Sequence, residues 1–532
     1  METLRSQNES LGIEVESLGI EVESLRMKSA EQEAKIKYYE EQIRLAAAKK
    51  YGASSEKNVS PEQLSIFNEA EKESGEDAKE PPLEEITYKR KRGGARKASS
   101  EKYDGLPTEE IHYELPEDER VCARCGGGMK EMGTDVRDEI AIIPAQIKVI
   151  RHVQHKYVCK DEACADEADS VNIVKARAPE PPIPHSPAGA SMIAHVMSRK
   201  YSEHVPLYRQ EQQFGYNGID IPRQNMANWV VLGAGLMEPV YERFREFLIG
   251  EDYVHADESP LQVLSEPGKK ATSKSYMWLY ATGRFRRRIF IYEYTRSRSG
   301  EHPKAFLRGF SGYLHTDGYA AYNSVPGVTL MGCFSHARRE YVDALKALPV
   351  DAEKSRALSA EGLAHIDGLF ELERGYEGMT PDERYAARLE KSKPALAAYK
   401  KWLDERKRAA LPRGKLGKAV NYSLNQWDKL KTFLEDGEIE LSNNRVENGI
   451  RPFAVGRKNW LFSKTPNGAK ASAVVYSVIE TAKANGLTPF FYLKFLLERL
   501  PNIAAGDTDA LDALMPWADD LPDEVKNPAK SD

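Results

Sequence analysis

Three acidic residues lie in sequence contexts that suit metal-dependent chemistry on phosphodiesters. Asp257 follows an apolar run in EDYVHADESPLQVL, Asp317 follows another in GYLHTDGYAAY, and Glu447 lies in ELSNNRVENGIRPF. Carboxylate oxygens suit Mg²⁺ and Mn²⁺, and two such ions about 3.5 to 4 Å apart can clamp a scissile phosphate while a strand is cut or joined. Each acid alone would be interpreted as an ordinary turn or cap residue, so the prediction depends on the elements around them.

The order of those elements predicts how the first two acids could meet. Asp257 ends a strand-like run, two more runs follow in SYMWLYAT and RRRIFIYEYT, and a short helical piece surrounds HPKAFLRGF. A fourth strand then delivers Asp317 before a glycine turn. An RNase H-like sheet needs this order to bring both acids together. Adjacent strand ends lie about 5 Å apart, so both carboxylates could bridge one ion.

Glu447 is expected on a helix. Ser442 or Asn443 could cap its first turn, and Arg451 would lie one turn after Glu447 on the same face. Basic residues follow along the same segment, and they could neutralise a phosphate backbone near the acids: Arg451, Arg457 and Lys458.

Four of the five cysteines form two pairs, Cys122 with Cys125 in CARC and Cys159 with Cys164 in CKDEAC. Four thiolates can close a tetrahedral shell around Zn²⁺, and the segment between the pairs alternates like the strands of a hairpin. The spacing therefore predicts a structural zinc ribbon. Buried, reduced cysteines are the alternative.

Further segments suit self-association and DNA contact. The repeat SLGIEVESLGIEVE places leucines seven residues apart, which predicts a coiled coil and a homo-oligomer, with one amphipathic helix packed on its own chain as the alternative. A basic run could contact phosphates, although such runs are often simply solvated, and it contains Lys89, Arg90, Lys91 and Arg92. The segment GYNGIDIPRQNMANWVV suits a helix-turn-helix with Arg223 near the second helix, or a plain helical linker.

Composition limits the class of protein. The chain has 532 residues, so several domains are expected, and its net charge of −6 means that any contact with nucleic acid must come from local basic patches. No stretch approaches the roughly 20 apolar residues of a membrane span, and no secretory signal is recognisable. We therefore expect no membrane partner and a cytoplasmic protein.

Several motifs resemble those of the TnpC-type transposases of the insertion-sequence-66 group. They are HADES, HTDGYAAY, GCFSHARREY, NNRVENGIRPFAVGRKNWLF, YGASSEK, CARCGG, KYSEHVPLYRQEQ and NGLTPFFYLKFLLERLP with ALMPW, which together extend over nearly the whole chain. The resemblance implies an RNase H-like core whose acidic triad falls on Asp257, Asp317 and Glu447. It also implies DNA ends and target DNA as substrates, and companion proteins of the same element as partners. Ser259 stands where the family often has Thr, and the second cysteine pair is wider than expected.

The distance between the second and third acids predicts an insertion. The 130 residues from Asp317 to Glu447 exceed a normal connection, and they contain helix-favouring stretches such as RALSAEGLAHIDGLFELERGY and ERYAARLEKSKPALAAYKKWLDERKR. Cys333 and His336 precede this segment, and we favour a packing role for them over a metal site because two ligands are half a site.

The predicted fold class is multidomain α+β, with an RNase H-like α/β catalytic core interrupted by an all-helical insertion. The expected domains are a coiled coil (1–50), a flexible basic linker (51–110), a zinc ribbon (111–175), a helical DNA-binding domain (188–248), the first part of the core (249–345), the insertion (346–435), the second part of the core (436–485) and a C-terminal helical segment (486–532).

The predicted function is that of a bacterial transposase that binds terminal inverted repeats and uses two Mg²⁺ or Mn²⁺ ions to cut and transfer DNA strands. Two alternatives remain open: a zinc-containing DNA-binding regulatory protein without catalysis, and a metal nuclease that cuts without joining.

Overall fold

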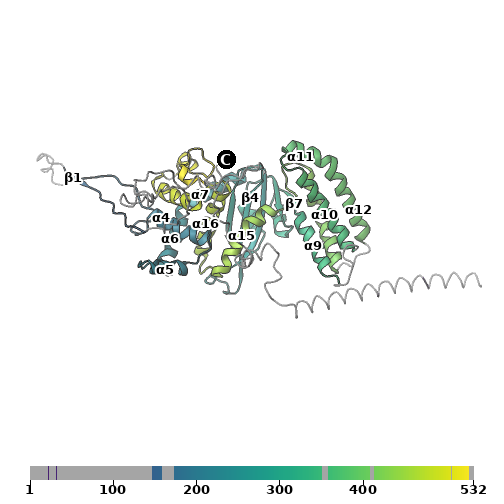
Figure 1. Cartoon of the computed structure of the whole chain (residues 1–532), viewed down its shortest axis with the longest axis horizontal. Helices are drawn as coiled ribbons and strands as arrows, with labels where there is room; N and C mark the ends of the chain where they lie inside the picture. Colours follow the sequence, from purple (N-terminus) through teal and green to yellow (C-terminus); the bar gives the residue numbers. More distant parts are fainter. Residues whose placement is uncertain are drawn as a thin grey trace, which may run out of the picture. The chain divides into compact units, whose positions relative to one another are not determined.

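The computed structural model of the chain describes residues 147–158, 173–349, 357–407, 413–504 and 506–526, together with Val22 and Gln32 (Figure 1). The chain divides into two compact units, one of residues 54–178 and one that combines residues 1–53 with 179–532. The expected coiled coil (apart from Val22 and Gln32), the basic run from Lys89 to Arg92 and all four paired cysteines lie outside the described residues.

The described part of the smaller unit contains a short hairpin. Strand β1 (Lys156–Val158) pairs antiparallel with β2 (Ile173–Lys175), and Lys156 stands opposite Lys175. Gln154 donates a side-chain hydrogen bond to the carbonyl of Ala176 (3.0 Å), which extends the pairing by one contact. Residues 159–172, which include the second cysteine pair, connect the two strands.

A five-stranded mixed sheet forms the centre of the larger unit. The strands are β3 (Tyr253–Gln262), β4 (Lys274–Thr282), β5 (Phe290–Thr295), β6 (Tyr313–Thr316) and β7 (Thr329–Gly332), and their order is β5-β4-β3-β6-β7. The first three pair antiparallel, whereas β6 and β7 run parallel to β3. The parallel connection from β5 to β6 passes over the sheet through helix α8 (Glu301–Phe306), and the 3₁₀ turn η5 (Ala320–Ser324) precedes β7.

Helix α16 (Pro466–Ala484) covers the outer edge of β5. The backbone N–H groups of Phe290 and Tyr292 donate to the hydroxyls of Thr481 (3.0 Å) and Ser477 (2.8 Å), and the Thr481 hydroxyl donates back to the Phe290 carbonyl. An uncovered edge strand would leave these groups available to another chain. The helix therefore ends the sheet on this side.

The N-terminal helices of the larger unit pack against its C-terminal helices. Helix α4 (Ala190–Tyr201) contacts α17 (Pro489–Arg499), and both α4 and α6 (Arg223–Leu236) contact α16. The remaining elements of this group are α5 (Leu207–Tyr216), α7 (Glu238–Ile249), the turn η9 (Leu500–Asn502), α18 (Thr508–Asp512) and η10 (Asp523–Val525). One apolar core joins these helices to the sheet.

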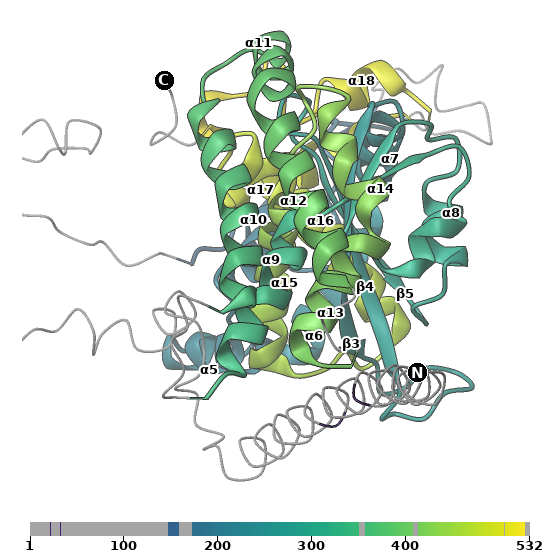
Figure 2. The ribbon, with the colours of Figure 1, turned by 90° about the vertical axis from the view of Figure 1, so that its right-hand side faces the viewer.

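The described residues between β7 and the Glu447 segment are mostly helical. Helices α9 (Phe334–Lys346), α10 (Leu358–Gly375), α12 (Lys393–Lys407) and α13 (Lys415–Asn425) lie side by side (Figure 2). Shorter pieces complete the group: α11 (Pro381–Ala387), the π-helical turn η7 (Arg388–Ser392), α14 (Trp427–Leu430) and η8 (Lys431–Leu434). A second apolar core fills their interior, after which the chain returns to the sheet as α15 (Asn444–Trp460).

Arg388 fixes the end of the helical segment. Its guanidinium is fully buried, pairs with Glu373 (2.7 Å), and donates to the carbonyls of Phe433, Asp436 and Ile439. A buried guanidinium costs several kcal/mol unless its donors are satisfied. The acceptors lie in η8 and in the turns between η8 and α15, so Arg388 holds this part of the chain in place.

Within the described residues, no helix is both long and apolar enough to cross a lipid bilayer.

The Arg388 contacts predict a large loss of stability on substitution. We expect Arg388→Ala to lower the free energy of unfolding by about 3 kcal/mol, because Glu373 loses a buried partner and three carbonyls lose their donor. The matched control is Arg338→Ala, which removes an exposed pair between Arg338 and Asp367 and should cost less than about 1 kcal/mol. Urea denaturation measures both. Equal losses in the two variants would contradict the assigned role of Arg388.

Candidate active site

Asp257 lies inside strand β3, not at its end. The strand continues to Gln262, so the prediction that Asp257 ends the strand is wrong, although the acid does lie on the strand that was expected. Alternation along the strand places Asp257 on the same face as His255. Its Oδ1 accepts a hydrogen bond from the backbone N–H of Glu258 (2.9 Å), and the side chain is half-buried.

Asp317 immediately follows strand β6. The parallel register pairs Tyr253 with Tyr313 and His255 with His315, and two further steps bring Asp257 level with Asp317 on the same face. The His255 and His315 rings lie 4.9 Å apart and show this proximity directly. Gly318 turns the chain away with φ of +93°, a conformation that favours glycine. The two acids therefore lie on neighbouring strands, as their spacing predicted.

The loop after Asp317 is fixed by two hydrogen bonds. The Tyr319 backbone N–H donates to Asp317 Oδ1 (2.8 Å), and the Tyr422 hydroxyl donates to the Asp317 carbonyl (2.9 Å). Tyr422 belongs to α13, so the helical segment between the second and third acids contacts the second acid itself. That segment therefore helps to position the site.

Glu447 occupies the first turn of α15, but Asn443 does not cap this helix with its side chain as predicted. The buried Asn443 amide accepts a hydrogen bond from His255 Nδ1 (2.9 Å) and donates one to the Ala256 carbonyl (2.9 Å). The Asn443 backbone N–H donates to Cys333 Sγ (3.2 Å), while its carbonyl accepts from the Glu447 N–H (3.2 Å). Asn443 therefore joins β3, the start of α9 and the start of α15.

Two side-chain contacts hold the buried His255 ring in place. Because the Asn443 NH₂ group faces the Ala256 carbonyl, its oxygen must face His255 Nδ1, which is then a donor. The other ring nitrogen lies 3.0 Å from Glu440 Oε2. Burial opposes ionisation of Glu440, but the contact with His255 outweighs it and lowers the pKa of Glu440 to about 2. The His255 ring therefore links Asn443 to Glu440.

The electrostatics of Asp257 show that negative charge is concentrated here. Burial raises the pKa of Asp257 to about 8, and the neighbouring charges of Glu258, Asp317 and Glu447 add to the effect, while the Glu258 N–H opposes it. A carboxyl group with such neighbours releases its proton when a cation supplies compensating charge. The three acids can therefore provide oxygen ligands to divalent metal ions.

The structure gives Glu447 neighbours that the sequence did not assign to the site. Glu447 Oε2 lies 3.3 Å from Arg339 Nη2, and Oε1 lies 3.5 Å from His336 Nδ1. In the part of the chain that the structure describes, one set of three candidate metal ligands has all its ligand atoms within 4.8 Å of one another, and that set is Cys333, His336 and Glu447. The three carboxylates themselves are spread more widely.

Sequence reasoning missed a support for the acids on the opposite face of the sheet. The Glu258 carboxylate accepts hydrogen bonds from Arg298 Nε (2.6 Å) and from the Tyr322 hydroxyl (2.7 Å). The Arg298 guanidinium lies 3.7 Å from the Tyr319 ring centroid, and the Tyr319 hydroxyl donates to the Arg298 carbonyl. These contacts tie β3 to the loop after Asp317. The adjacent acids in HADES were the available signal.

The predicted DNA-contacting residues lie in different surroundings. Arg451 and Lys458 are exposed on α15, whereas Arg457 is half-buried and donates to the Pro260 carbonyl, and burial lowers its pKa. Arg223 is exposed at the start of α6, where its backbone N–H donates to Glu211 of α5 (2.8 Å). The Trp460 ring at the end of α15 lies 4.1 Å from Lys200 Nζ.

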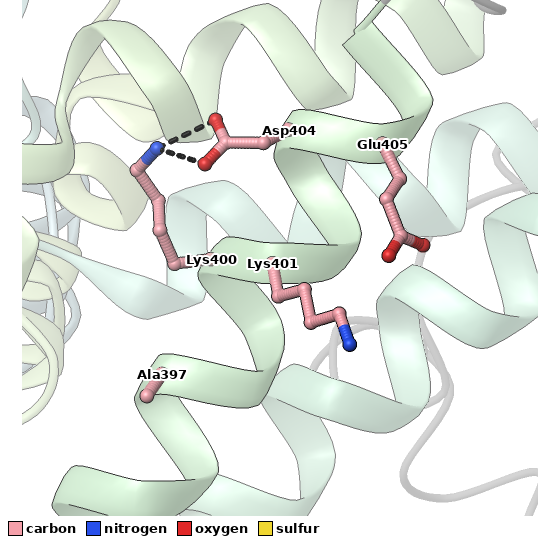
Figure 3. Close-up of a pocket in the computed structure, with 5 residues that line it drawn as sticks. All are labelled: Ala397, Lys400, Lys401, Asp404 and Glu405. Atoms are coloured by element: carbon pink, nitrogen blue, oxygen red, sulfur yellow. Dashed lines mark hydrogen bonds and ion pairs between the residues drawn. The ribbon is translucent and has the colours of Figure 1, made fainter.

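A surface hollow of about 660 Å³ lies on helix α12, apart from the acids (Figure 3). Its lining comes from this one helix: Ala397, Lys400, Lys401, Asp404 and Glu405. Lys400 and Asp404 pair with each other at 2.6 Å, so two of its charged groups already have a partner. This hollow does not contribute to the candidate active site.

Comparisons with known families cover most of the chain. Residues 185–471 match the family described as "Transposase IS66 family", and residues 477–517 match an "IS66 C-terminal element". Residues 119–161 match a "zinc-finger binding domain of transposase IS66", a span that contains Cys122, Cys125 and Cys159 and ends before Cys164. Residues 38–111 match "Transposase C of IS166 homeodomain".

Individual relatives come from Sinorhizobium fredii. The protein y4jD is 31% identical over 441 residues, which cover 79% of this chain and 83% of the relative. The protein y4qI is 30% identical over 419 residues, which cover 75% of this chain and 74% of the relative. Both carry the name "Uncharacterized protein". No solved structure matches the chain.

The raised pKa of Asp257 predicts a specific dependence of stability on pH. In the absence of divalent metal, the folded protein holds this proton up to a pKa of about 8, whereas the unfolded chain loses it near the ordinary value of about 3.9. The stabilisation is therefore complete below the unfolded value and is lost as the pH rises through the folded one, at up to about 1.4 kcal/mol per pH unit.

Asp257→Asn should remove this dependence, so the variant should gain stability relative to the unsubstituted protein as the pH rises from 4 to about 8. Thermal unfolding in chelator across that range measures the difference. The control is Asp520→Asn at an exposed position. A difference between Asp257→Asn and the unsubstituted protein that stays constant with pH would show that Asp257 is not protonated in the folded state.

Proposed function

The chain belongs to the IS66 family of transposases, and we propose that Asp257, Asp317 and Glu447 catalyse metal-dependent cleavage and transfer of DNA strands. The observation that carries the proposal is the parallel pairing of β3 with β6, which brings Asp257 level with Asp317 on one face of the sheet. The raised pKa of Asp257, to which the Asp317 and Glu447 charges contribute, supports the inclusion of Glu447.

An RNase H-like core is part of this proposal. Three antiparallel strands followed by two parallel strands, in the order β5-β4-β3-β6-β7, support it, because the central strand and its parallel neighbour carry the first two acids. The third acid returns on α15, which packs on β3 and β4 after the helical segment. The IS66 family match over residues 185–471 spans all of these elements.

The acids would bind the metal ions, and neighbouring residues would position the acids. Asp257 and Asp317 would hold one Mg²⁺ or Mn²⁺ ion between them, and Glu447 would complete a second position. The bound ions supply Lewis-acid activation of the attacking oxygen and charge stabilisation of the leaving oxygen. Gly318 and the Tyr422 hydroxyl fix the backbone that carries Asp317. Asn443 fixes the first turn that carries Glu447, so both acids reach the site from immobilised backbone.

DNA binding would draw on basic groups beyond the acids. Arg451 and Lys458 are exposed on the helix that carries Glu447, and they would contact the phosphate backbone. Arg457 would stabilise β3 through the Pro260 carbonyl as well as contribute charge. Arg223 on α6 and the basic run from Lys89 to Arg92 would extend the contact, with α5 and α6 acting as a helix-turn-helix.

The remaining parts of the proposal concern assembly. Cys122, Cys125, Cys159 and Cys164 would hold a structural Zn²⁺, and the zinc-finger match over residues 119–161 supports this for the first three. The leucine repeat near the N-terminus would form a homo-oligomer, and accessory proteins of the same element would join the complex on DNA.

Substitution of the acids tests catalysis. With Mg²⁺ and a labelled duplex that carries the element's terminal inverted repeat, Asp257→Asn, Asp317→Asn and Glu447→Gln should each lower strand cleavage by more than the roughly 10- to 100-fold that loss of an outer-shell contact costs. Binding of the duplex in a gel-shift assay should persist. Glu405→Gln, at an exposed position on α12, is the control. Normal cleavage by the acid variants would refute the site, and binding without cleavage by the unsubstituted protein would favour a regulatory DNA-binding protein.

Substitution of basic residues tests the DNA surface separately. Arg451→Ala should weaken binding similarly for all sequences and reduce the slope of log K against log salt by about 0.9, which corresponds to one phosphate contact. Arg374→Ala removes an exposed arginine of α10 and should leave the slope unchanged. Binding titrations from 50 to 200 mM salt provide the measurement, and identical slopes for Arg451→Ala and the unsubstituted protein would exclude Arg451 from the interface.

A further inference from the structure

Cys333 and His336 lie at the start of α9 with a spacing that suits a metal site. Cys333 is the N-cap residue of the helix, and His336 lies in its first turn, so a Cys-x-x-His pair points from one helix end. Glu447 approaches from the first turn of α15, and the three ligand atoms lie within 4.8 Å of one another. The sequence offered only two of the four ligands that a tetrahedral metal site needs, and the fold places a third beside them.

His336 and Glu447 each have one buried polar atom that lacks a hydrogen-bond partner. His336 Nδ1 and Glu447 Oε1 are buried and make no hydrogen bond, although they lie 3.5 Å apart. A buried polar atom without a partner costs about 1–3 kcal/mol. Cys333, His336 and Glu447 each place one ligand atom within 4.8 Å of the other two. A cation bound among them could give the unpartnered atoms of His336 and Glu447 a partner.

Burial raises the pKa of the Cys333 thiol to about 11, and backbone N–H groups oppose that rise. The Asn443 N–H donates to Cys333 Sγ (3.2 Å), and the backbone N–H groups of His336 and Ser335 also contact it. Backbone donors and a helix N-terminus stabilise negative charge on sulfur. Outer-shell hydrogen bonds of this kind orient metal ligands. Cys333 is therefore already held in the position of a ligand.

We propose that Cys333, His336 and Glu447 bind one thiophilic divalent cation of the Zn²⁺ class, with water at the fourth position. Sulfur and imidazole favour Zn²⁺ over Mg²⁺, so this site differs in selectivity from the positions proposed at Asp257 and Asp317. The two sites share Glu447, whose second oxygen remains beside Arg339. The cation would link the start of α9 to the start of α15 and fix the orientation of Glu447.

Metal analysis and Co²⁺ spectroscopy of the full chain test the proposal. Cys333→Ser and His336→Ala should each retain about one zinc fewer per chain than the unsubstituted protein. Titration with Co²⁺ should give a thiolate-to-cobalt charge-transfer band that Cys333→Ser loses in part. Cys122→Ser, which affects the separate cysteine pairs, is the matched control and should leave the Cys333-dependent part of the band intact.

Further measurements separate this proposal from the proposed catalytic function. The double variant Asp257→Asn with Asp317→Asn should cleave no DNA yet keep the Cys333-dependent Co²⁺ band, and excess Mg²⁺ should not displace it. Circular dichroism establishes that each variant is folded, and His336→Ala, whose side chain is partly exposed, decides the question if Cys333→Ser fails to fold. Unchanged zinc content and an unchanged Co²⁺ spectrum in His336→Ala would overturn the proposal, whatever the cleavage assay shows.

Discussion

The buried amide of Asn443 is the constraint on which the geometry of the candidate site depends. Its side chain contacts both His255 and the Ala256 carbonyl of β3, and its backbone contacts Cys333 and Glu447. Because Asn443 is fully buried, each of its polar atoms must find a partner within the protein, and the available partners fix its position. One residue therefore determines how the helix that carries Glu447 meets the strand that carries Asp257.

The Asn443 contacts form only if the helical segment between β7 and α15 brings the chain back to the sheet in the correct position. The helical segment begins directly after β7 and ends near Ile439, which lies one residue before the partner of His255, Glu440. Arg388 holds the returning backbone through three carbonyls, and Tyr422 connects the same segment to Asp317. An insertion of this size costs little in loop-closure entropy when its ends are fixed. The contacts of Arg388 and Tyr422 therefore make the helical segment a support of the candidate site.

The sequence predicted the parts of the site that follow from local pattern. Alternating apolar residues located the strands of Asp257 and Asp317, and their spacing predicted that the acids would be neighbours. It placed Asp257 at the end of its strand because the polar residues that follow Asp257 resemble a turn, whereas pairing with β4 extends the strand to Gln262. It proposed Ser442 or Asn443 as the cap of the Glu447 helix. Asn443 is the N-cap residue, but its side chain bonds His255, 188 residues away, instead of the helix backbone. Long-range contacts also explain why Glu258 and Cys333 were not predicted as parts of the site.

The two adjacent acids of β3 have different electrostatic surroundings on the two faces of the sheet. Burial raises the pKa of Glu258, but hydrogen bonds from Tyr322 and Arg298 oppose that effect, so its charge has partners within the protein. Asp257 has one backbone donor and faces the charges of Asp317 and Glu447. Because side chains alternate along a strand, Glu258 points toward Arg298 and Tyr322, whereas Asp257 points to the opposite face, toward other acids. Like charges held together by a rigid fold are relieved by a proton, as the raised pKa of Asp257 indicates, or by a cation.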